Sequence, residues 1–493
     1  MICQAIEGHA RHAPEAVALR FEDAVVTYGE LVRHVAAAAQ WLQALGIGHG
    51  DRITFLGHNH PSQLVLLLAG ARIGALQVPL NWRLAVPELA AILEDSEAVL
   101  LFAAPEMQHL ACRAAPEGCE ILEATAVWPG LAPAEAVLPR PESEPGDGVL
   151  LVYTSGTTGQ PKGAVIDRQG LLFNALNAQH MVGLQASDRV LTVLPLFHVG
   201  GLNIQTLPAL LTGAEVVLLP RFDPAGVFAA CARYRPTLTL LVPAAMRALL
   251  ADPGWAGAAL GSLRAVGAGS SEVPLDLIAA FAARGLPVQQ VYGATETGPV
   301  AICQTRAEAL AAPGSIGRPA LFGEARVVDA TGVPLPPGEA GEIELRGPHL
   351  ARGYWQAPEA TAAAWREDGW FATGDIGRVD AAGRFWFTDR LKHLIISGGE
   401  NIYPAEVERV LRAAPGIAEG AVCGRPDERW GEVPVAVVVP GPGFDPAAVL
   451  AHFEGRLARF KHPRAVLPVP ALPRTALGKV QVEALRRLAR TGA

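Results

Sequence analysis

The sequence predicts an α/β fold made of parallel-sheet α/β subdomains, a small β subdomain and a smaller α+β unit near the C-terminal end. Three observations support this prediction. Short apolar runs alternate with Ala-rich segments through the middle of the chain, which is typical of parallel strands joined by crossover helices. Beyond Pro313 the runs change to period-two alternation with glycine turns, which indicates antiparallel strands. Beyond Lys392 short helical and strand-like segments follow one another.

The expected strands of the parallel region are apolar runs bounded by polar or glycine-containing segments. They cover residues 149–153, 190–194, 215–219, 238–242, 264–268 and 288–292. Helices are expected at residues 167–181, 228–234, 244–251 and 275–284. FLGHN and LQVPLN mark two earlier strand ends, and the Pro- and Glu-rich stretch from Pro129 to Pro145 is expected to be an exposed connector.

The β subdomain is expected to contain the segments EARVVD, GEIELRG and RFWFTDR, whose apolar residues alternate with polar ones. In the C-terminal unit we expect a helix, two strands and a second helix. These cover residues 405–413, 420–423, 433–439 and 446–459, respectively.

Composition excludes several classes of protein. The chain has 493 residues, half of them hydrophobic, which suggests about three domains with a large core. No uninterrupted apolar run of about 18 residues predicts a membrane span, and no signal peptide is evident. A net charge of −8 with mixed signs argues against nucleic acid or an anionic membrane as the main partner.

The cysteines and histidines give no sign of a metal centre. Six cysteines are scattered without a CxxC pair, so we expect reduced thiols and a cytoplasmic location. His58 and His60 are too few for a metal site, and a loop or helix-start role is expected for them.

The stretch YTSGTTGQPKG, residues 153–163, is suited to bind a polyphosphate. It follows an expected strand and precedes an expected helix. Its glycines leave backbone N–H groups free to approach an anion, its hydroxyls add neutral donors, and Lys162 adds a positive charge. It is not a Walker A loop, because Gln160 and Pro161 separate Gly159 from Lys162. A flexible surface turn is the alternative interpretation of such a cluster.

Five further motifs follow this loop in order. They are LPLFHVGG (194–201), VYGATETGP (291–299), WFATGDIG (370–377), DRLKHLIISGGENIYP (389–404) and PRTALGK (473–479). With them the chain resembles the adenylate-forming superfamily of acyl- and aryl-CoA synthetases, firefly-type luciferases and peptide-synthetase adenylation domains. The resemblance covers nearly the whole chain and is strongest for the acyl- or aryl-CoA ligase branch.

The resemblance implies a domain arrangement. Residues 1–388 would form the N-terminal adenylate-forming domain, and residues 393–493 a small mobile C-terminal domain. The hinge would be residues 389–392, with Lys392 as its pivot. The C-terminal domain would swing about this hinge, so that one active site could run two reactions.

The resemblance also implies a nucleotide site for ATP and Mg²⁺. Tyr292 could stack on adenine, Thr295 could bind a phosphate oxygen, Glu296 could bind Mg²⁺, and Asp375 with Arg390 could bind the ribose. The phosphate loop would supply Thr154, Ser155, Gly156, Thr157, Thr158, Gly159 and Lys162, and Gly293 would complete the nucleotide site. A capping Thr, a solvated Glu, a turn Asp and a surface ion pair are the structural alternatives.

Lys479 and His198 are the expected catalytic residues beside Thr295 and Glu296. Lys479 matches the family's mobile catalytic loop and would bridge the carboxylate and the α-phosphate. His198 would lie near the acyl carboxylate and admit the thiol, although a histidine at an apolar strand end is more often a core residue. The acyl pocket would be lined by Phe197, His198, Val199, Gly200, Gly293, Gly298 and Pro299. Gln289 and Gln290 offer no second cation, so a monocarboxylic acid is expected.

The CoA passage would be formed by residues of the C-terminal unit. Ser397, Gly398 and Gly399 would line it for pantetheine, with Trp430, Phe460 and Lys461 touching CoA. A simple β-turn at Gly398–Gly399 and ordinary packing of Trp430 are the alternatives. His462 stands where some relatives carry Arg, which puts one phosphate contact in doubt.

The sequence thus predicts an AMP-forming acid–CoA ligase for a fatty or aromatic acid, with ATP, CoA and Mg²⁺ as cosubstrates and activator. No nucleophilic Ser or Cys is assigned, and a homodimer is left open. Two alternatives remain: an enzyme that loads a carrier-protein thiol or releases acyl-AMP, and a non-catalytic nucleotide-binding protein.

Overall fold

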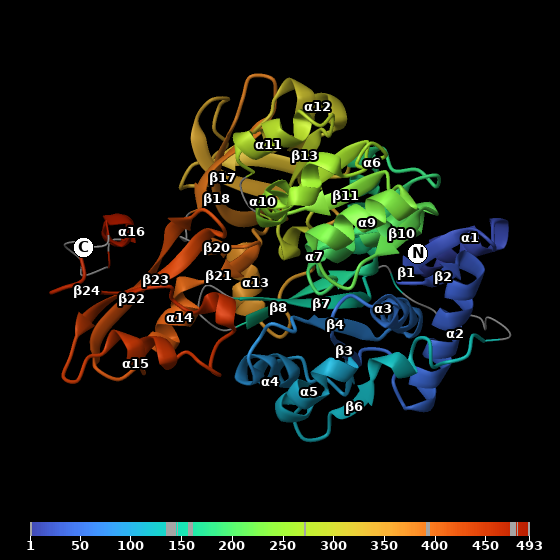
Figure 1. Cartoon of the computed structure of the whole chain (residues 1–493), viewed down its shortest axis with the longest axis horizontal. Coiled ribbons are helices and arrows are strands. Elements are labelled where there is room, and N and C mark those ends of the chain that lie inside the picture. The colour runs from blue at the N-terminus through green and yellow to red at the C-terminus, as the bar shows by residue number, and fades with distance from the viewer. Residues whose placement is uncertain are drawn as a thin grey trace. The chain divides into compact units, whose positions relative to one another are not determined.

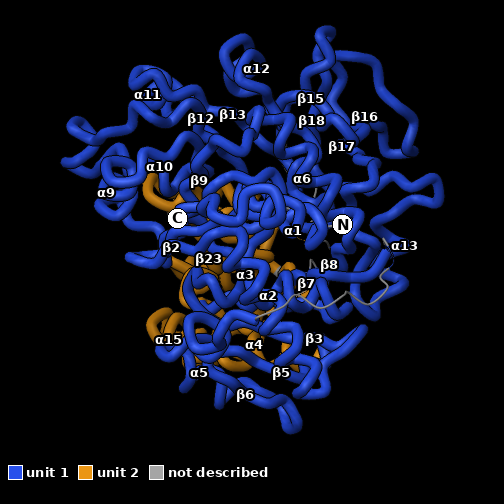
Figure 2. Tube along the Cα trace, turned by 90° about the vertical axis from the view of Figure 1, so that its right-hand side faces the viewer, with its two compact units in different colours: residues 1–82, 96–152, 163–389 blue, residues 83–95, 153–162, 390–493 orange. Residues whose placement is uncertain are grey.

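The structure is a computed structural model that describes residues 2–134, 144, 146–155, 161–270, 273–390, 395–473, 480 and 482–491. The chain divides into two compact units (Figure 2). Unit 1 comprises residues 1–82, 96–152 and 163–389, and unit 2 comprises residues 83–95, 153–162 and 390–493. The predicted boundary at residues 388–393 is not tested by this division and stays a prediction.

The first sheet of unit 1 has the strand order β6-β5-β3-β4-β7-β8. β3 pairs in parallel with β4 and β5, and β4 pairs in parallel with β7, so the strand ends predicted at FLGHN and LQVPLN are confirmed. The strands are β3 (Arg52–Leu56), β4 (Leu76–Leu80), β5 (Leu100–Ala103), β6 (Glu120–Glu123), β7 (Gly148–Ser155) and β8 (Pro161–Asp167). The last residues of β7, from Tyr153 onward, and the first two residues of β8 belong to unit 2.

Helix α3 (Pro61–Ile73) lies between β3 and β4 in the chain, and residues at both of its ends define where it starts and stops. Pro61 stands in the first turn, the His60 ring accepts a hydrogen bond from the Ser62 N–H, and Gly74 ends the helix at φ 87°. Every residue of α3 is buried, including the polar residues Ser62, Gln63 and Arg72, as expected for a mostly apolar helix that is covered on all sides. The predicted helix-start role of His60 is confirmed.

The second sheet of unit 1 has nine strands in the order β15-β14-β13-β12-β11-β9-β10-β1-β2. Strands β13 to β1 run parallel, and β2, β14 and β15 pair antiparallel at the edges. The strands are β1 (Val17–Phe21), β2 (Ala24–Thr27), β9 (Arg189–Thr192), β10 (Glu215–Leu218), β11 (Leu238–Leu241), β12 (Ala265–Ala268), β13 (Val288–Tyr292), β14 (Ile302–Cys303) and β15 (Arg318–Pro319). The predicted parallel runs are confirmed, with residues 149–153 in the first sheet and the others in this one.

Helices join and cover these strands, as Figure 1 shows for α9, α10 and α11 in front of the nine-stranded sheet. The predicted helices are confirmed with small shifts at their ends. The helices of unit 1 are α1 (Ile2–His12), α2 (Tyr28–Ala44), α3, α5 (Gln108–Ala114), α6 (Arg168–Val182), α7 (Val199–Gly201), α8 (Leu207–Thr212), α9 (Pro224–Tyr234), α10 (Pro243–Ala251), α11 (Leu275–Ala282), α12 (Arg306–Ala311) and α13 (Pro358–Ala364), with short turns η1 (Pro105–Met107), η2 (Ala124–Ala126), η3 (Leu202–Thr206), η4 (Pro253–Gly257) and η5 (Thr295–Thr297).

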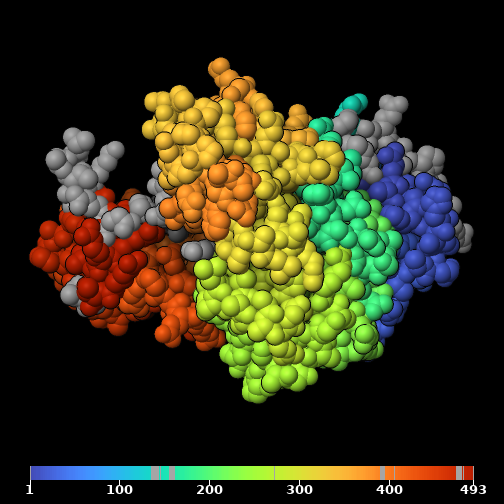
Figure 3. All heavy atoms as spheres, turned by 90° about the horizontal axis from the view of Figure 1, so that it is seen from above, coloured from blue at the N-terminus to red at the C-terminus, as the bar shows by residue number. Residues whose placement is uncertain are grey.

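The third sheet of unit 1 has the order β16-β17-β18-β19, and β16, β17 and β18 pair antiparallel. The predicted antiparallel β subdomain is therefore confirmed. Its strands are β16 (Glu324–Val328), β17 (Ala340–Arg346), β18 (Phe371–Val379) and β19 (Phe385–Arg390). The segment that carries it is yellow to orange in Figure 3 and reaches the surface on the face drawn there.

Unit 2 contains a sheet with the order β21-β20-β23-β22, to which β24 adds beside β23. Alternate residues of β23 face two different apolar cores: Ala436 and Val438 share one with α14 and α15, whereas Val435 and Val437 share the other with α16. The elements are β20 (Ile395–Ser397), β21 (Glu400–Ile402), β22 (Ile417–Asp427), β23 (Gly431–Pro440), β24 (Val466–Pro468), α4 (Val86–Asp95), α14 (Pro404–Leu411), α15 (Pro446–Ala451), α16 (Val482–Thr491) and η6 (Arg459–Lys461).

One prediction for unit 2 is wrong in length. The helix predicted for residues 446–459 ends at Ala451, the last residue of α15. The chain then turns, and Gly455 adopts a φ of 70°, a left-handed conformation that an α-helix cannot contain. Phe453 and Leu457 are buried in the core nonetheless, so their helix-like spacing reflects packing of the turns. None of the helices in the described ranges has the length and apolar character that a membrane crossing needs.

Candidate active site

The predicted nucleotide residues of unit 1 gather at the end of β13. Gly293 follows the strand, and a Cβ there would lie 2.3 Å from the Pro299 carbonyl oxygen. Gly298 has a φ of 68°, and a Cβ there would lie 2.3 Å from the His349 carbonyl oxygen. Both positions therefore require glycine, which fixes the turn that carries Thr295 and Glu296.

Tyr292 and Asp375 are brought together by the structure. The Tyr292 hydroxyl donates to Asp375 Oδ2 at 2.8 Å. Asp375 lies in β18 and is buried, and its N–H donates to Thr373 Oγ1. The predicted adenine and ribose residues are thus in direct contact, although the prediction had paired Asp375 with Arg390. The side chain of Arg390 lies outside the described residues.

Glu296 is 9% exposed and contacts a tyrosine that the sequence analysis did not single out. The Tyr354 hydroxyl donates to Glu296 Oε1 at 2.9 Å. The two residues are 58 positions apart, so no local pattern could have shown the contact.

Glu296 could bind a divalent cation together with the phosphates of ATP. No group of three or more His, Cys, Asp or Glu residues suited to a metal is present in the described ranges. Mg²⁺ is commonly held by one or two carboxylates together with substrate phosphates. A single buried carboxylate is therefore compatible with Mg²⁺ that arrives with ATP.

The LPLFHVGG segment places two aromatic rings against each other. The ring centroids of Phe197 and His198 are 4.6 Å apart, and His198 precedes the short helix α7. At Gly200 a Cβ would meet only Ser270 Oγ at 3.9 Å, whereas at Gly201 it would lie 2.2 Å from the Pro195 carbonyl oxygen. A side chain at Gly200 would therefore find space, Gly201 is required for packing, and the pocket role of Gly200 stays a prediction. Val199 is buried, and a π-helical turn, η3, follows α7.

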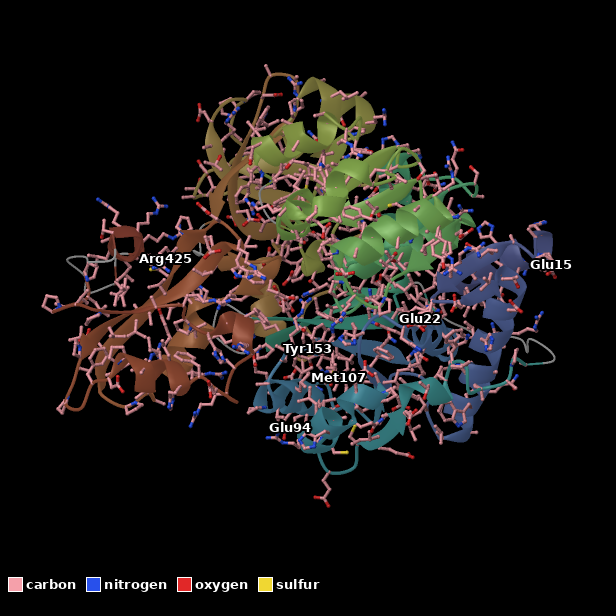
Figure 4. The ribbon with its side chains drawn as sticks, viewed as in Figure 1. Glu15, Glu22, Glu94, Met107, Tyr153 and Arg425 are labelled. Atoms are coloured by element: carbon pink, nitrogen blue, oxygen red, sulfur yellow. The ribbon has the colours of Figure 1, made fainter. Side chains whose placement is uncertain are left out.

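The predicted phosphate loop is described only at its two ends, in unit 2. Thr154 and Ser155 end β7, Lys162 lies in β8, and the Tyr153 hydroxyl donates to Asp95. Figure 4 labels Tyr153 near the end of its strand. Four predicted loop residues, Gly156, Thr157, Thr158 and Gly159, lie outside the described residues, as does the side chain of Ser155.

The predicted CoA residues of unit 2 include one close contact. Gly398 has a φ of 60°, its N–H donates to the Trp430 carbonyl oxygen at 2.8 Å, and a Cβ there would lie 2.7 Å from the indole ring. Gly398 and Gly399 form the turn between β20 and β21. The Arg429 guanidinium carbon lies 4.8 Å from the centre of the Trp430 ring. The turn and the packing of Trp430 are both present, and contact with CoA stays a prediction.

Lys461 is engaged by two carboxylates. Its Nζ donates at 2.7 Å to both Glu88 and Glu406, and the residue is only 4% exposed. Burial opposes the charge on Lys461, but the two carboxylates outweigh burial and raise its pKa. The ammonium group is hydrogen-bonded to two carboxylates. The predicted contact with a CoA phosphate would require these ion pairs to open. Phe460 lies beside it, with its ring centre 5.7 Å from Lys461 Nζ.

Besides the four residues of the phosphate loop, two further predicted residues lie wholly outside the described residues. These are the hinge residue Lys392 and the catalytic residue Lys479. Their roles, like those of the other predicted site residues, stay predictions.

Comparison with known proteins identifies the family. Residues 6–355 match the family described as AMP-binding enzyme, and residues 406–479 match the AMP-binding enzyme C-terminal domain. The chain belongs to the AMP-binding enzyme family. The predicted resemblance to adenylate-forming enzymes is confirmed.

Relatives of this AMP-binding enzyme match it over nearly its full length. It is 46% identical to indoleacetate–CoA ligase of Aromatoleum aromaticum, over 98% of this chain and 97% of the relative. It is 44% identical to feruloyl-CoA synthase of an Amycolatopsis species, over 97% of each chain. A solved structure of o-succinylbenzoate CoA synthetase from Bacillus subtilis, bound to a product analogue, superimposes with a TM-score of 0.89 at 31% identity and covers 98% of both chains. The predicted acid–CoA ligase class is confirmed by these relatives.

Proposed function

We propose that this AMP-binding enzyme is an ATP-dependent ligase that joins an aryl monocarboxylic acid to CoA through an acyl-adenylate. The observation that carries the proposal is the full-length identity to two aryl acid–CoA ligases, combined with the arrangement of Tyr292, Asp375, Thr295 and Glu296 around the end of β13. The aryl preference rests on the names of these relatives and is narrower than the predicted choice between fatty and aromatic acids.

In the first half-reaction a carboxylate oxygen attacks the α-phosphorus of ATP, the new O–P bond forms, and pyrophosphate leaves. Asp375 with Arg390 would hold the ribose, Tyr292 and Gly293 the adenine, and Thr295 a phosphate oxygen. Lys479 would bridge the substrate carboxylate and the α-phosphate, where negative charge accumulates. Glu296 would hold Mg²⁺, which when bound supplies charge neutralisation on the phosphates.

In the second half-reaction the CoA thiolate attacks the acyl carbon, and the C–O bond to AMP breaks. His198 would move aside to admit the thiol, while Phe197 and Gly200 border the acyl group. Rotation about Lys392 would bring Gly398, Gly399 and Trp430 to the pantetheine. All of these roles are proposals that follow from family membership and position.

We also propose a cytoplasmic location. All six cysteines of the sequence are free thiols in the structure. Burial raises the pKa of several of them, for example that of Cys231 to about 11, so they remain protonated at neutral pH and react slowly.

An acid panel tests the proposal. The purified protein is incubated with ATP, Mg²⁺ and CoA and with indoleacetate, ferulate, cinnamate, benzoate or medium- and long-chain fatty acids. We expect CoA-dependent AMP release and acyl-CoA formation, with kcat/KM for one of the aryl acids at least about tenfold above that for any fatty acid.

Three outcomes would contradict parts of the proposal. Higher kcat/KM for fatty acids would overturn the aryl preference. Acid-dependent pyrophosphate release without consumption of free CoA would indicate a carrier-loading or adenylate-releasing enzyme. Absence of acid-dependent pyrophosphate exchange with every acid would indicate a nucleotide-binding protein without ligase activity.

A further inference from the structure

Tyr354 contacts the carboxylate that is predicted to bind the cation of ATP. Its hydroxyl donates to Glu296 Oε1 at 2.9 Å. We propose that Tyr354 is a positioning residue, which holds the Glu296 carboxylate in the orientation that receives a divalent cation bound to ATP. This inference rests on the proposed function and adds a residue that acts through Glu296.

The backbone around Tyr354 is fixed by strand β8. Residues 352–355 run beside it: the Val165 N–H donates to the Gly353 carbonyl oxygen at 3.0 Å, and the Trp355 N–H donates to the Gly163 carbonyl oxygen at 2.7 Å. Ala164 and Tyr354 form an antiparallel bridge between these two bonds. This single bridge and its flanking hydrogen bonds hold the Tyr354 backbone against β8, the edge strand of the six-stranded sheet.

The same segment also holds the main chain of Glu296. The Ala351 N–H donates to the Glu296 carbonyl oxygen at 2.8 Å. Glu296 thus accepts two hydrogen bonds from this segment: one at its backbone carbonyl from Ala351 and one at its carboxylate from Tyr354. A hydroxyl bond to an ionised carboxylate is stronger than one between neutral groups, and it restricts the rotation of the side chain.

The Tyr354 ring is itself held in place by aromatic contacts. It meets Trp365 edge-on, with ring centroids 5.5 Å apart, and Trp365 meets Phe371 at 4.7 Å. Phe371 is the first residue of β18, the strand that also carries Asp375. The Tyr354 N–H donates to Thr361 Oγ1 at 2.9 Å. A residue this constrained loses little conformational entropy in holding Glu296, which is the physical requirement for a preorganised site.

Calorimetric titration of ATP in the presence and absence of Mg²⁺ tests the inference without relying on ligase activity. In the wild-type protein Mg²⁺ should strengthen ATP binding. In Tyr354→Phe, which keeps the ring and its contact with Trp365, we expect this strengthening to fall about tenfold while the affinity for metal-free ATP is unchanged. The Mg²⁺ concentration for half-maximal acyl-adenylate formation should rise by a similar factor.

The matched control is Tyr234→Phe. The Tyr234 hydroxyl donates to the backbone carbonyl oxygen of Glu22, and Figure 4 labels Glu22. Like Tyr354→Phe, this variant loses one phenolic hydroxyl that donates a hydrogen bond, and its Mg²⁺ dependence should match the wild type.

A double-mutant cycle with Glu296→Gln separates loss of positioning from loss of stability in Tyr354→Phe. If Tyr354 acts through Glu296, adding Tyr354→Phe to Glu296→Gln should cause no further loss of the Mg²⁺ effect. An unchanged Mg²⁺ effect in Tyr354→Phe would overturn the inference. Equal loss of ATP affinity with and without Mg²⁺ would also overturn it, because a merely structural role has that result. A wild-type protein that binds Mg²⁺–ATP but forms no thioester would overturn only the proposed function.

Discussion

The hydroxyl of Tyr292 donates a hydrogen bond to Asp375 at 2.8 Å, which joins the end of a strand in the nine-stranded sheet to the third strand of the β16–β19 sheet. The two residues are 83 positions apart. The bond sets the orientation of a buried carboxylate that we propose to bind ribose. It also ties the β subdomain to the turn that carries Thr295 and Glu296.

Tyr292→Phe tests this relationship. Phenylalanine keeps a ring that can stack on adenine but cannot donate to Asp375. Because a hydrogen bond to a charged group contributes about 1.5–3 kcal/mol, we expect the KM for ATP to rise about tenfold or more, with a smaller change in kcat. Steady-state kinetics at saturating acid and CoA measure both. An unchanged KM would show that the carboxylate needs no support from Tyr292 once the nucleotide is bound.

Lys479→Ala separates the two half-reactions. The lysine is proposed to stabilise charge only while the carboxylate attacks the α-phosphate. We therefore expect acyl-AMP formation to be abolished, while thioester formation from supplied acyl-AMP and CoA continues at a rate near that of the wild type. Single-turnover assays of each half-reaction make the measurement. Equal loss of both half-reactions would contradict the proposed role.

Lys461→Met tests the buried ion pairs of unit 2. The substitution keeps an unbranched side chain but leaves Glu88 and Glu406 buried without their cation. Removing one partner of a buried ion pair typically costs about 3–5 kcal/mol, so the free energy of unfolding of unit 2 should fall by about that amount. Urea denaturation followed by tryptophan fluorescence measures it.

The control for Lys461→Met is Arg412→Met on the same unit. Arg412 lies 3.9 Å from Glu408 and its side chain is 69% exposed. Loss of such an exposed pair should cost less than about 1 kcal/mol. Further substitution of Glu88 and Glu406 by Gln should restore most of the stability lost in Lys461→Met. If the lysine variant unfolds like the arginine variant, the buried contacts do not stabilise the unit.

His349 gives a prediction for pH. It is fully buried, and burial lowers its pKa from 6.5 to about 4. Between these values the unfolded chain binds a proton that the folded protein does not. The free energy of unfolding therefore suffers no loss from His349 above pH 6.5. It falls as the pH drops from 6.5 towards 4, by at most about 3 kcal/mol from this residue.

His349→Gln should reduce this acid-dependent loss. Thermal unfolding measured from pH 7 to pH 4 should show a shallower decline in the variant than in the wild type, as about 3 kcal/mol of the decline is assigned to the histidine. The control for the substitution itself is His180→Gln at an exposed position. A parallel decline in all three proteins would show that other groups govern acid unfolding.

Local features of the fold were predictable because each depends on a few neighbouring residues. The parallel strands and the helices between them follow from the spacing of apolar residues, and the antiparallel strands follow from period-two runs such as GEIELRG. The helix predicted for residues 446–459 failed because buried residues in turns, such as Phe453 and Leu457, imitate helical spacing. Periodicity reports which residues are buried and does not report the backbone conformation that buries them.

The sequence predicts which residues form the candidate site, and those roles stay predictions, but it does not predict their contacts. Motif order predicts that Glu296 and Asp375 belong to a nucleotide site. It does not predict that the hydroxyls of Tyr354 and Tyr292 donate to their carboxylates. Lys461 was predicted to meet CoA, and the structure places it between Glu88 and Glu406. Glu88 is 373 positions from Lys461, so no window along the chain contains both.

The sequence by itself determined much of the order of strands and helices and the family, and it predicts an anion-suited loop, because these depend on residue types at short spacing. Only the tertiary structure decided which hydroxyl meets which carboxylate and which lysine is buried. Those contacts depend on the order of strands within the sheets and on the packing of segments far apart along the chain, and a single sequence does not specify either by local pattern alone.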